Sequence, residues 1–262
     1  MKTISNFFLF FVLTVFFVSC KDEMMFKNET YTNPNFCNKE ENCLQVKLDV
    51  LEAEDTNPLK DSINYHIFDI VKTSLDLSDG AQSLKNYVDL INQYENYYKA
   101  FGEELKTNDT LNPVINWEAT SLVKLNYQTE YILNFAIEHY NFTGGAHGYG
   151  ASKSLIIDAV TGRKLDYKYL LTNLDMIKRL GEQQLREKYE IGQGKSLNAY
   201  GFFFENDKFE LPENIFFNKE SIVLHYNQYE IASYAFGPID LELSNKEIGK
   251  YLVTKRFEQQ AK

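Results

Sequence analysis

The sequence is poor in the residues and motifs that build common catalytic sites. Its 262 residues include only three cysteines and four histidines. None of the histidines lies in a His-Glu-x-x-His zinc helix, and neither a Gly-x-Ser-x-Gly elbow nor a reactive cysteine accompanies them. These absences argue against hydrolases of the familiar zinc, serine and cysteine types, and we expect neither an enzyme nor a cofactor.

Positive charge is also scarce. The chain has 27 Lys and Arg against 37 Asp and Glu, which gives a formal net charge of −10. Phosphate binding relies on Lys and Arg, so such a chain is a poor partner for nucleic acid or anionic lipid headgroups. We therefore expect no nucleic-acid partner. An acidic surface would instead favour a cationic one.

Long apolar runs are missing except at the start, where residues 7–18 are apolar apart from Thr14. The run is shorter than the roughly 20 residues that span a bilayer, and it follows Met1-Lys2, as in a secretory signal. Residues 17–20, Phe-Val-Ser-Cys, resemble the bacterial lipobox. We expect residues 1–19 to be a lipoprotein signal peptide and Cys20 to carry palmitate. An ordinary cleaved signal followed by a stray cysteine is the alternative.

This reading places the protein outside the cytoplasm, anchored by lipid to the outer membrane on its periplasmic or cell-surface face. The charged residues that follow Cys20, Lys21-Asp22-Glu23, resemble the surface-export tag of some Bacteroidetes lipoproteins. Residues 20–43 are polar and read as a tether.

Two further cysteines, Cys37 and Cys43, flank five polar residues within this predicted tether. An even pair in an oxidising compartment favours a disulfide that closes a small loop. A metal site is the competing reading, but it would need two more ligands nearby, and no histidine is closer in sequence than His66.

The hydrophobic pattern beyond the tether alternates between the periods of helix and strand, in blocks. The sequence therefore predicts an α+β fold of antiparallel sheets packed with amphipathic helices. Strands are expected within 44–50, 122–127, 131–142, 155–157, 215–217, 222–226 and 239–243, and helices within 63–75, 84–105 and 174–189, with a last helix opened by a capping box at 244–247.

Two stretches carry a resemblance to a known family. The first is Tyr-Asn-Phe-Thr-Gly-Gly-Ala-His-Gly at 140–148, followed by Asp-Ala-Val-Thr-Gly-Arg-Lys-Leu at 158–165. The second is Ile-Val-Leu-His-Tyr-Asn-Gln-Tyr-Glu-Ile-Ala-Ser-Tyr-Ala-Phe-Gly at 222–237. Together they resemble the extracytoplasmic domain pair of RsiV-like anti-sigma factors, which also precedes the catalytic domain of the peptidoglycan deacetylase PdaC.

The resemblance implies a pair of intimately joined halves of unknown function, a PdaC N-terminal-like domain at 44–148 and an RsiV C-terminal-like domain at 149–262. It implies a non-enzymatic envelope module that binds peptidoglycan, another glycan or a cationic lysozyme-like protein. The Gly-Gly-Ala-His segment would lie at the seam between the halves.

His147 is the histidine with the most open role, because Gly144 and Gly145 before it let the backbone approach another group closely. It could be the general base of a glycan- or peptide-directed hydrolase, which is the alternative function. It could instead bond to backbone and order the seam, or contact a ligand. The other three histidines, on a predicted helix or strand, are expected to have structural or surface roles.

Tyr226, Tyr229, Glu230 and Tyr234 form a second candidate cluster, of which Tyr229, Glu230 and Tyr234 are the candidate ligand residues. Aromatic rings beside a carboxylate could bind sugar through stacking and hydrogen bonds. Core packing is the competing explanation, because the chain has 18 tyrosines in all.

Overall fold

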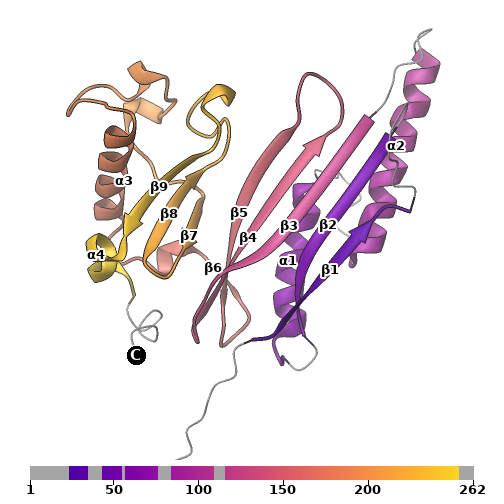
Figure 1. Ribbon diagram of the computed structural model, residues 1–262, viewed down its shortest axis with the longest axis horizontal. Coiled ribbons are helices and arrows are strands. Elements are labelled where there is room, and N and C mark those ends of the chain that lie inside the picture. Colours follow the sequence, from indigo (N-terminus) through magenta and orange to yellow (C-terminus); the bar gives the residue numbers. More distant parts are fainter. Residues whose placement is uncertain (1–23, 35–42, 55–56, 76–83, 109–115, 254–262) are drawn as a thin grey trace, which may run out of the picture.

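The computed structural model describes residues 24–34, 43–54, 57–75, 84–108 and 116–253, which form two α+β halves side by side, each built on its own sheet (Figure 1). The α+β class is confirmed. The predicted signal peptide, Cys20 and Cys37 lie outside the described residues, so lipidation and the disulfide stay predictions. No helix of the described part is long and apolar enough to cross a membrane.

The first half holds a six-stranded sheet in the order β1-β2-β3-β4-β5-β6. Helix α1 packs against β2, β4 and β5, and α2 against β1 and β2, so both cover the same face (Figure 1). The bounds are β1 Phe26–Thr32, β2 Cys43–Ala53, α1 Lys60–Ser74, α2 Tyr87–Asn108, β3 Asn116–Gln128, β4 Ile132–Phe142, β5 Tyr149–Asp158 and β6 Lys164–Leu165.

This sheet is mixed, which corrects the prediction of antiparallel sheets throughout. β2 and β3 run parallel, in register from Cys43↔Asn116 to Asp49↔Leu122. Parallel neighbours need a long crossover connection, and α1 and α2 lie in the segment that joins these two strands. The alternation of apolar residues locates a strand, but it does not reveal the direction of its neighbour.

The tether predicted for residues 20–43 is wrong in its central part, because β1 lies there. It pairs antiparallel with β2 from Phe26↔Ala53 to Thr32↔Lys47. The strand has few aliphatic residues, and two aromatic ones attach it to the core. The ring of Phe26 lies 5.5 Å from that of Phe135, and the ring of Tyr31 lies 4.8 Å from that of Tyr87.

The second half holds a three-stranded antiparallel sheet in the order β7-β8-β9, and α3 packs against β9. Because β5 and β6 continue the first sheet, the two sheets divide after residue 165, whereas the domain boundary predicted from the sequence lies at 148. The bounds are α3 Leu174–Lys188, β7 Asn214–Phe217, β8 Ser221–Tyr226, β9 Ile239–Ser244 and α4 Asn245–Ile248, with short 3₁₀ turns at Tyr167–Tyr169, Asn198–Tyr200, Glu205–Asp207, Tyr234–Phe236 and Gly249–Tyr251.

The predicted capping box at the start of α4 is present, since Ser244 and Glu247 bond reciprocally there. A tight hairpin also forms at 158–163, with Gly162 at φ +72°, a conformation that favours glycine. Both features follow from local sequence alone.

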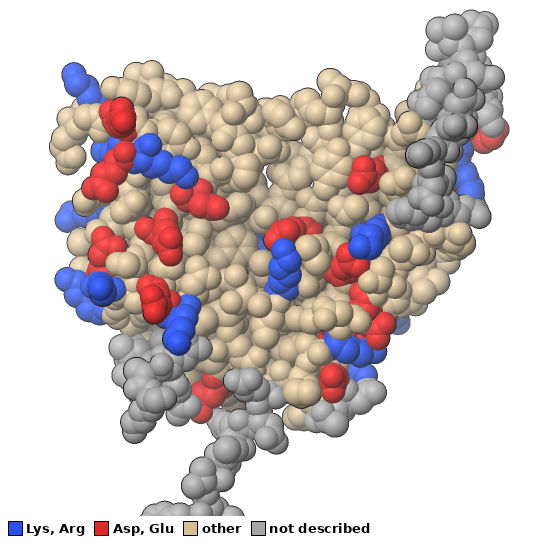
Figure 2. Space-filling view, in the orientation of Figure 1, with Lys and Arg blue, Asp and Glu red and all other residues tan. Residues whose placement is uncertain are grey.

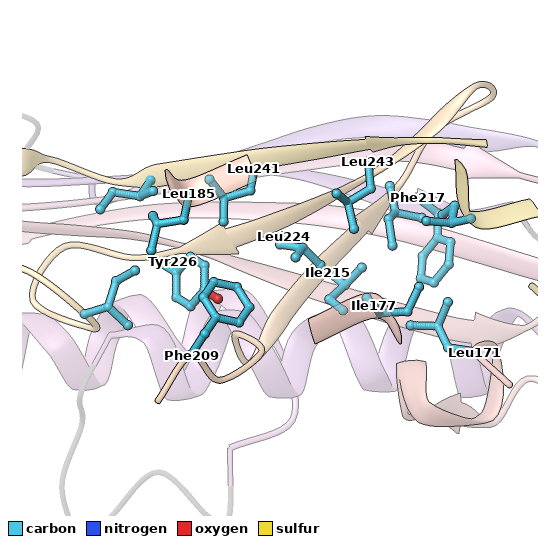
Figure 3. Close-up of a cluster of buried hydrophobic side chains, with 14 of the residues drawn as sticks. Leu171, Ile177, Leu185, Phe209, Ile215, Phe217, Leu224, Tyr226, Leu241 and Leu243 are labelled. Atoms are coloured by element: carbon cyan, nitrogen blue, oxygen red, sulfur yellow. The ribbon is translucent and has the colours of Figure 1, made fainter. Parts of the chain in front are cut away.

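Each half has its own apolar core, and the second core reaches into the first sheet. It lies between the sheet β7–β9 and α3, with Ile177 and Leu185 of the helix facing Leu224 and Leu241 of the strands (Figure 3). Three side chains of the first sheet belong to it as well: Tyr127, Ile132 and Ile156. The first sheet is therefore buried on both faces where the second half covers it.

Candidate functional site

A line of buried amide groups, with the half-buried hydroxyl of Ser154 among them, joins the two sheets, and it fixes how the loops at their ends face one another. Asn134 on β4 is fully buried, and its Oδ1 accepts a hydrogen bond from the backbone N–H of Phe217 on β7 at 2.8 Å. Its Nδ2 donates to Ser154 Oγ at 2.8 Å, and that hydroxyl donates to the carbonyl of Ile215 at 2.7 Å. The backbone edge of β7 is thus satisfied by side chains of the first sheet.

In the opposite direction, side chains of the second half bond to the backbone edge of β5. Asn214 Oδ1 accepts from the N–H of Ser154 at 2.9 Å. Asn227 Oδ1 accepts from the N–H of Ser152 at 2.7 Å, and its Nδ2 donates to the carbonyl of Ser152 at 3.1 Å. The two asparagine amides occupy the place of a neighbouring strand, so this edge of β5 is covered. We call these bonds the asparagine junction.

His225 supports the asparagine junction from within the second sheet. It is buried, with Nδ1 2.6 Å from Asp240 Oδ1 and Nε2 3.2 Å from Asn227 Oδ1. The bond from Asn227 to the Ser152 carbonyl orients the amide so that oxygen faces the imidazole. Both ring nitrogens then face acceptors, an arrangement that only the protonated ring satisfies fully. Burial works against the charge, but the hydrogen bonds to Asp240 and Asn227 and the charges of Asp240 and Glu230 together outweigh it, so the pKa of His225 is raised.

Two loops meet at the end of the asparagine junction, residues 143–148 between β4 and β5 and residues 227–238 between β8 and β9; both lie at the upper end of Figure 1. The ring of His147 stacks on that of Tyr234, with centroids 4.4 Å apart and planes at 22°. Tyr229 lies 5.6 Å from Tyr234. Three residues that the sequence singled out, from both halves, therefore come together, and we call them the aromatic surface.

The aromatic surface is open to solvent. Tyr229 is 52% exposed, Tyr234 is 38% exposed, and His147 also falls in the exposed class. In the space-filling view, charged side chains of both signs are interspersed over the two halves, while the upper edge between the halves carries none (Figure 2). Core packing, the competing explanation for these tyrosines, does not account for exposed rings. It does hold for Tyr226, which is buried and donates to the carbonyl of Glu210 at 2.6 Å.

Gly144 and Gly145 shape the loop that carries His147. Both have positive φ, +105° and +93°, and neither has a neighbour within 4 Å of where a Cβ would stand. The loop therefore needs glycine for its backbone conformation and not for close approach of another group. Gly148 is different, because the ring of Tyr140 occupies the position of its Cβ.

Glu230 has a role in the turn beneath the aromatic surface. Its Oε2 accepts from the N–H of Asn227 at 2.8 Å, and its Oε1 accepts from the N–H of Glu213 at 3.3 Å. Both carboxylate oxygens are therefore engaged with backbone. Glu230 holds the 227–230 turn in which Tyr229 adopts φ +66°, so it positions a candidate ligand residue.

A polar cavity of about 600 Å³ adjoins the 143–148 loop on the helix-covered side of the first sheet. Its lining includes Lys153, His139 and His147, and no Asp or Glu is among the lining residues. His139 Nδ1 is buried without a hydrogen-bond partner among the described residues. Burial, reinforced by the charge of Lys153, lowers the pKa of His139, so this imidazole is neutral near pH 7. The remaining lining residues are Thr73, Ser74, Asn141, Thr143, Gly144 and Tyr149.

The contacts of His147 do not form a catalytic arrangement. Its Nδ1 lies 3.1 Å from the carbonyl oxygen of the next residue, Gly148, and its ring lies against Tyr234. Neither contact supplies a nucleophile or an orienting carboxylate. In the described part of the chain, no group of three or more His, Cys, Asp or Glu side chains is placed to hold a metal ion.

Comparison with known proteins agrees with this two-part architecture. Residues 37–149 match the family described as deacetylase PdaC, and residues 168–246 match the family described as protein of unknown function (DUF3298). The chain carries a PdaC-like domain followed by a DUF3298 domain. The resemblance inferred from the two sequence stretches is thereby confirmed at the level of the domain pair.

Two solved bacterial structures share this fold. A DUF3298 family member from Bacteroides fragilis superposes with a TM-score of 0.71 at 18% identity, covering 91% of this chain and 98% of its own. A DUF3298 family protein from Pseudomonas aeruginosa gives 0.60 at 16% identity, covering 90% and 97%. At these identities the likeness shows the fold alone. No curated protein matches the chain.

Proposed function

We propose that this protein is a non-enzymatic binding module of the bacterial cell envelope that holds peptidoglycan or a related glycan. The observation that carries the proposal is the aromatic surface, three exposed rings contributed by both halves at one end of the molecule. Tyrosine offers a flat apolar face with a polar tip, which suits the C–H faces and hydroxyls of a sugar ring.

The asparagine junction supports this proposal, because it fixes the two loops that carry the rings. Binding to a surface that is already ordered avoids the entropic cost of ordering it. The acid-free polar cavity beside His147 adds hydroxyl, amide and amine groups that could bond to the substituents of a sugar. The resemblance to the region that precedes the catalytic domain of a peptidoglycan deacetylase points to the same class of ligand.

A cationic lysozyme-like protein is the second candidate, favoured by the net charge of −10. Glycan is preferred because the uncharged edge at the aromatic surface lies apart from the acidic side chains seen in Figure 2. Hydrolysis by His147 is the remaining alternative. The surroundings of His147 support it less, since its contacts are a backbone carbonyl and a tyrosine ring.

The test is co-sedimentation of the mature chain with purified insoluble peptidoglycan at low salt, with Cys20→Ser keeping the protein free of lipid. Retention in the pellet, together with unchanged peptidoglycan after long incubation, is expected. Soluble sugar or peptide released by the wild type but not by His147→Ala would favour the hydrolase. Failure to retain protein, with lysozyme captured in a parallel pull-down, would favour the cationic partner.

A further inference from the structure

The polar cavity beside His147 continues into a second one along β5. A cavity of about 870 Å³ shares Thr73 and Lys153 with it, so the two adjoin at these residues. The second cavity extends past Ser154 and Ile156 to β6 and the 3₁₀ turn Tyr167–Tyr169. Its opposite wall is the segment 211–215, which leads into β7. We call the combined depression the β5 groove.

The β5 groove has the shape needed by a linear chain and not by a single small molecule. It follows the strand from Tyr149 at one end to Ile156 at the other. Seven steps of roughly 3.3 Å make about 23 Å, which is room for several sugar rings. The aromatic surface lies at the Tyr149 end, since His147 belongs both to it and to the groove lining.

The charge of the β5 groove is opposite to that of the whole protein. Three lysines line it, Lys153, Lys164 and Lys168, against two acids, Asp166 and Glu213. In the chain as a whole, acids outnumber Lys and Arg by 37 to 27. In the part next to His147, the lining holds Lys153 and no acid.

The acids in the β5 groove neutralise these lysines only weakly. Lys153 Nζ lies 3.5 Å from Glu213 Oε2, and the Glu213 side chain is 79% exposed. Lys168 Nζ lies 3.8 Å from Asp166 Oδ2, and both of these side chains are largely exposed. Exposed pairs of this kind contribute about 0–1 kcal/mol, so an incoming carboxylate could replace either acid at little cost.

Aromatic rings flank the lysines at both ends of the β5 groove. Tyr149 is 43% exposed at one end, and Tyr169 is 72% exposed at the other. Tyr167 stands beside Tyr169, with Lys168 Nζ 5.8 Å from its ring centroid. Stacking faces at the ends and cations between them match a polymer whose sugar rings alternate with acidic substituents.

We propose that the β5 groove binds a linear glycan strand that carries carboxylate groups, with the lysines pairing the carboxylates and the tyrosines stacking on the sugars. The proposal rests on the glycan-binding function and deepens it, because it assigns the acidic part of the ligand to the β5 groove and leaves neutral sugar to the aromatic surface. Peptidoglycan strands with stem peptides and uronic-acid polymers share this chemistry.

The test compares two double charge reversals in the mature chain. Lys164→Glu with Lys168→Glu alters the β5 groove, and Lys27→Glu with Lys124→Glu makes the same charge change on exposed lysines elsewhere in the first half. Each variant is titrated with solubilised peptidoglycan strands, with oligogalacturonate and with neutral N-acetylglucosamine oligomers. The groove variant should bind the acidic strands about tenfold more weakly, and the control less than about twofold.

Binding of the neutral oligomers should be equal in both variants. If the groove variant loses affinity for both acidic ligands, the β5 groove binds carboxylates in general. If it loses affinity for peptidoglycan strands alone, the groove is specific for that source. If the groove variant binds acidic strands as tightly as the wild type does, the assignment of the β5 groove is overturned, while the glycan-binding function stands. A wild type that binds none of the three ligands would overturn both.

Discussion

The side-chain oxygen of Asn134 accepts a hydrogen bond from the backbone N–H of Phe217, 83 positions further along the chain, at 2.8 Å. Asn134 is fully buried in the first sheet, and Phe217 lies in the first strand of the second. This contact and its neighbours, together with the side chains of the first sheet that enter the second core, join the two sheets into one scaffold. The position of Tyr234 against His147 depends on that scaffold, because the two rings come from different halves.

Replacement of Asn134 by alanine is the first prediction. The N–H of Phe217 would be left buried and unpaired, and Ser154 would lose a donor, so the free energy of unfolding should fall by about 2–3 kcal/mol. Asn28→Ala, on an exposed position of β1, is the matched control and should change it by less than about 0.5 kcal/mol. Chemical denaturation measures both. Equal stability of the two variants would contradict the role given to the asparagine junction.

The sequence predicts the individual helices and strands better than it predicts how the two halves contact each other. Apolar residues at period two located β2, and apolar residues at helical spacing located α1, because burial on one face shows directly in the pattern. β1 was missed because its core contacts come from two aromatic residues five positions apart, Phe26 and Tyr31, with polar residues between them. A search for alternating apolar residues does not detect such a strand.

A pH dependence of stability is the second prediction. The pKa of His225 in the folded protein lies above its unfolded value of about 6.5, so protonation favours the fold. This stabilisation is complete below about pH 6.5 and is lost as pH rises through the raised folded pKa. Burial lowers the pKa values of His66 and His139, and these two residues make stability rise with pH instead. The contribution of His225 must therefore be measured as the difference in stability between the wild type and a variant.

His225→Gln is that variant, and Asp240→Asn is a second one that keeps the imidazole but removes its acidic partner. Thermal or chemical unfolding from pH 5 to pH 9 measures the difference from wild type. That difference should be largest at the acidic end and shrink toward the alkaline end for both variants. A difference that is constant with pH would show that the pKa of His225 is the same in the folded and the unfolded protein, which would contradict the raised value.

Gly181 in α3 provides a third prediction. A Cβ at this position would stand 2.7 Å from Leu224 Cδ1 and 2.8 Å from the ring of Phe209. Alanine favours helix over glycine by about 1 kcal/mol, but overpacking costs about 1–3 kcal/mol, so Gly181→Ala should be destabilising overall. Gly249→Ala is the control, because no atom lies within 4 Å of its Cβ position. A stabilised Gly181→Ala would mean that α3 lies further from β8 than described.

The fourth prediction concerns the anchor, which rests on the sequence alone. Wild-type protein expressed in a Gram-negative host should incorporate labelled palmitate and fractionate with membranes. Cys20→Ser should abolish both, since one thioether-linked cysteine carries the attachment. Persistence of the label in the variant would place the lipid elsewhere, and absence of label from wild type would favour an ordinary cleaved signal.

The candidate site was only partly visible in the sequence. His147, Tyr229 and Tyr234 stood out as residues and do come together. Asn227 did not stand out, because a polar residue just after a strand is usually a surface residue unless another sheet covers it. For His225 the structure gives the structural one of its two expected roles, structural or surface. Glu230 was assigned to the ligand for its charge, whereas its carboxylate bonds to backbone N–H groups.

The central claim is that glycan binds at the aromatic surface, and a quantitative titration of peptidoglycan-derived oligosaccharide with two tyrosine variants tests it most directly. Tyr234→Ala removes a ring that contacts both His147 and Tyr229, while Tyr65→Ala removes a ring that is 61% exposed on α1. The first should weaken binding about tenfold and the second should leave it unchanged. Equal affinities of Tyr234→Ala and wild type would contradict the account.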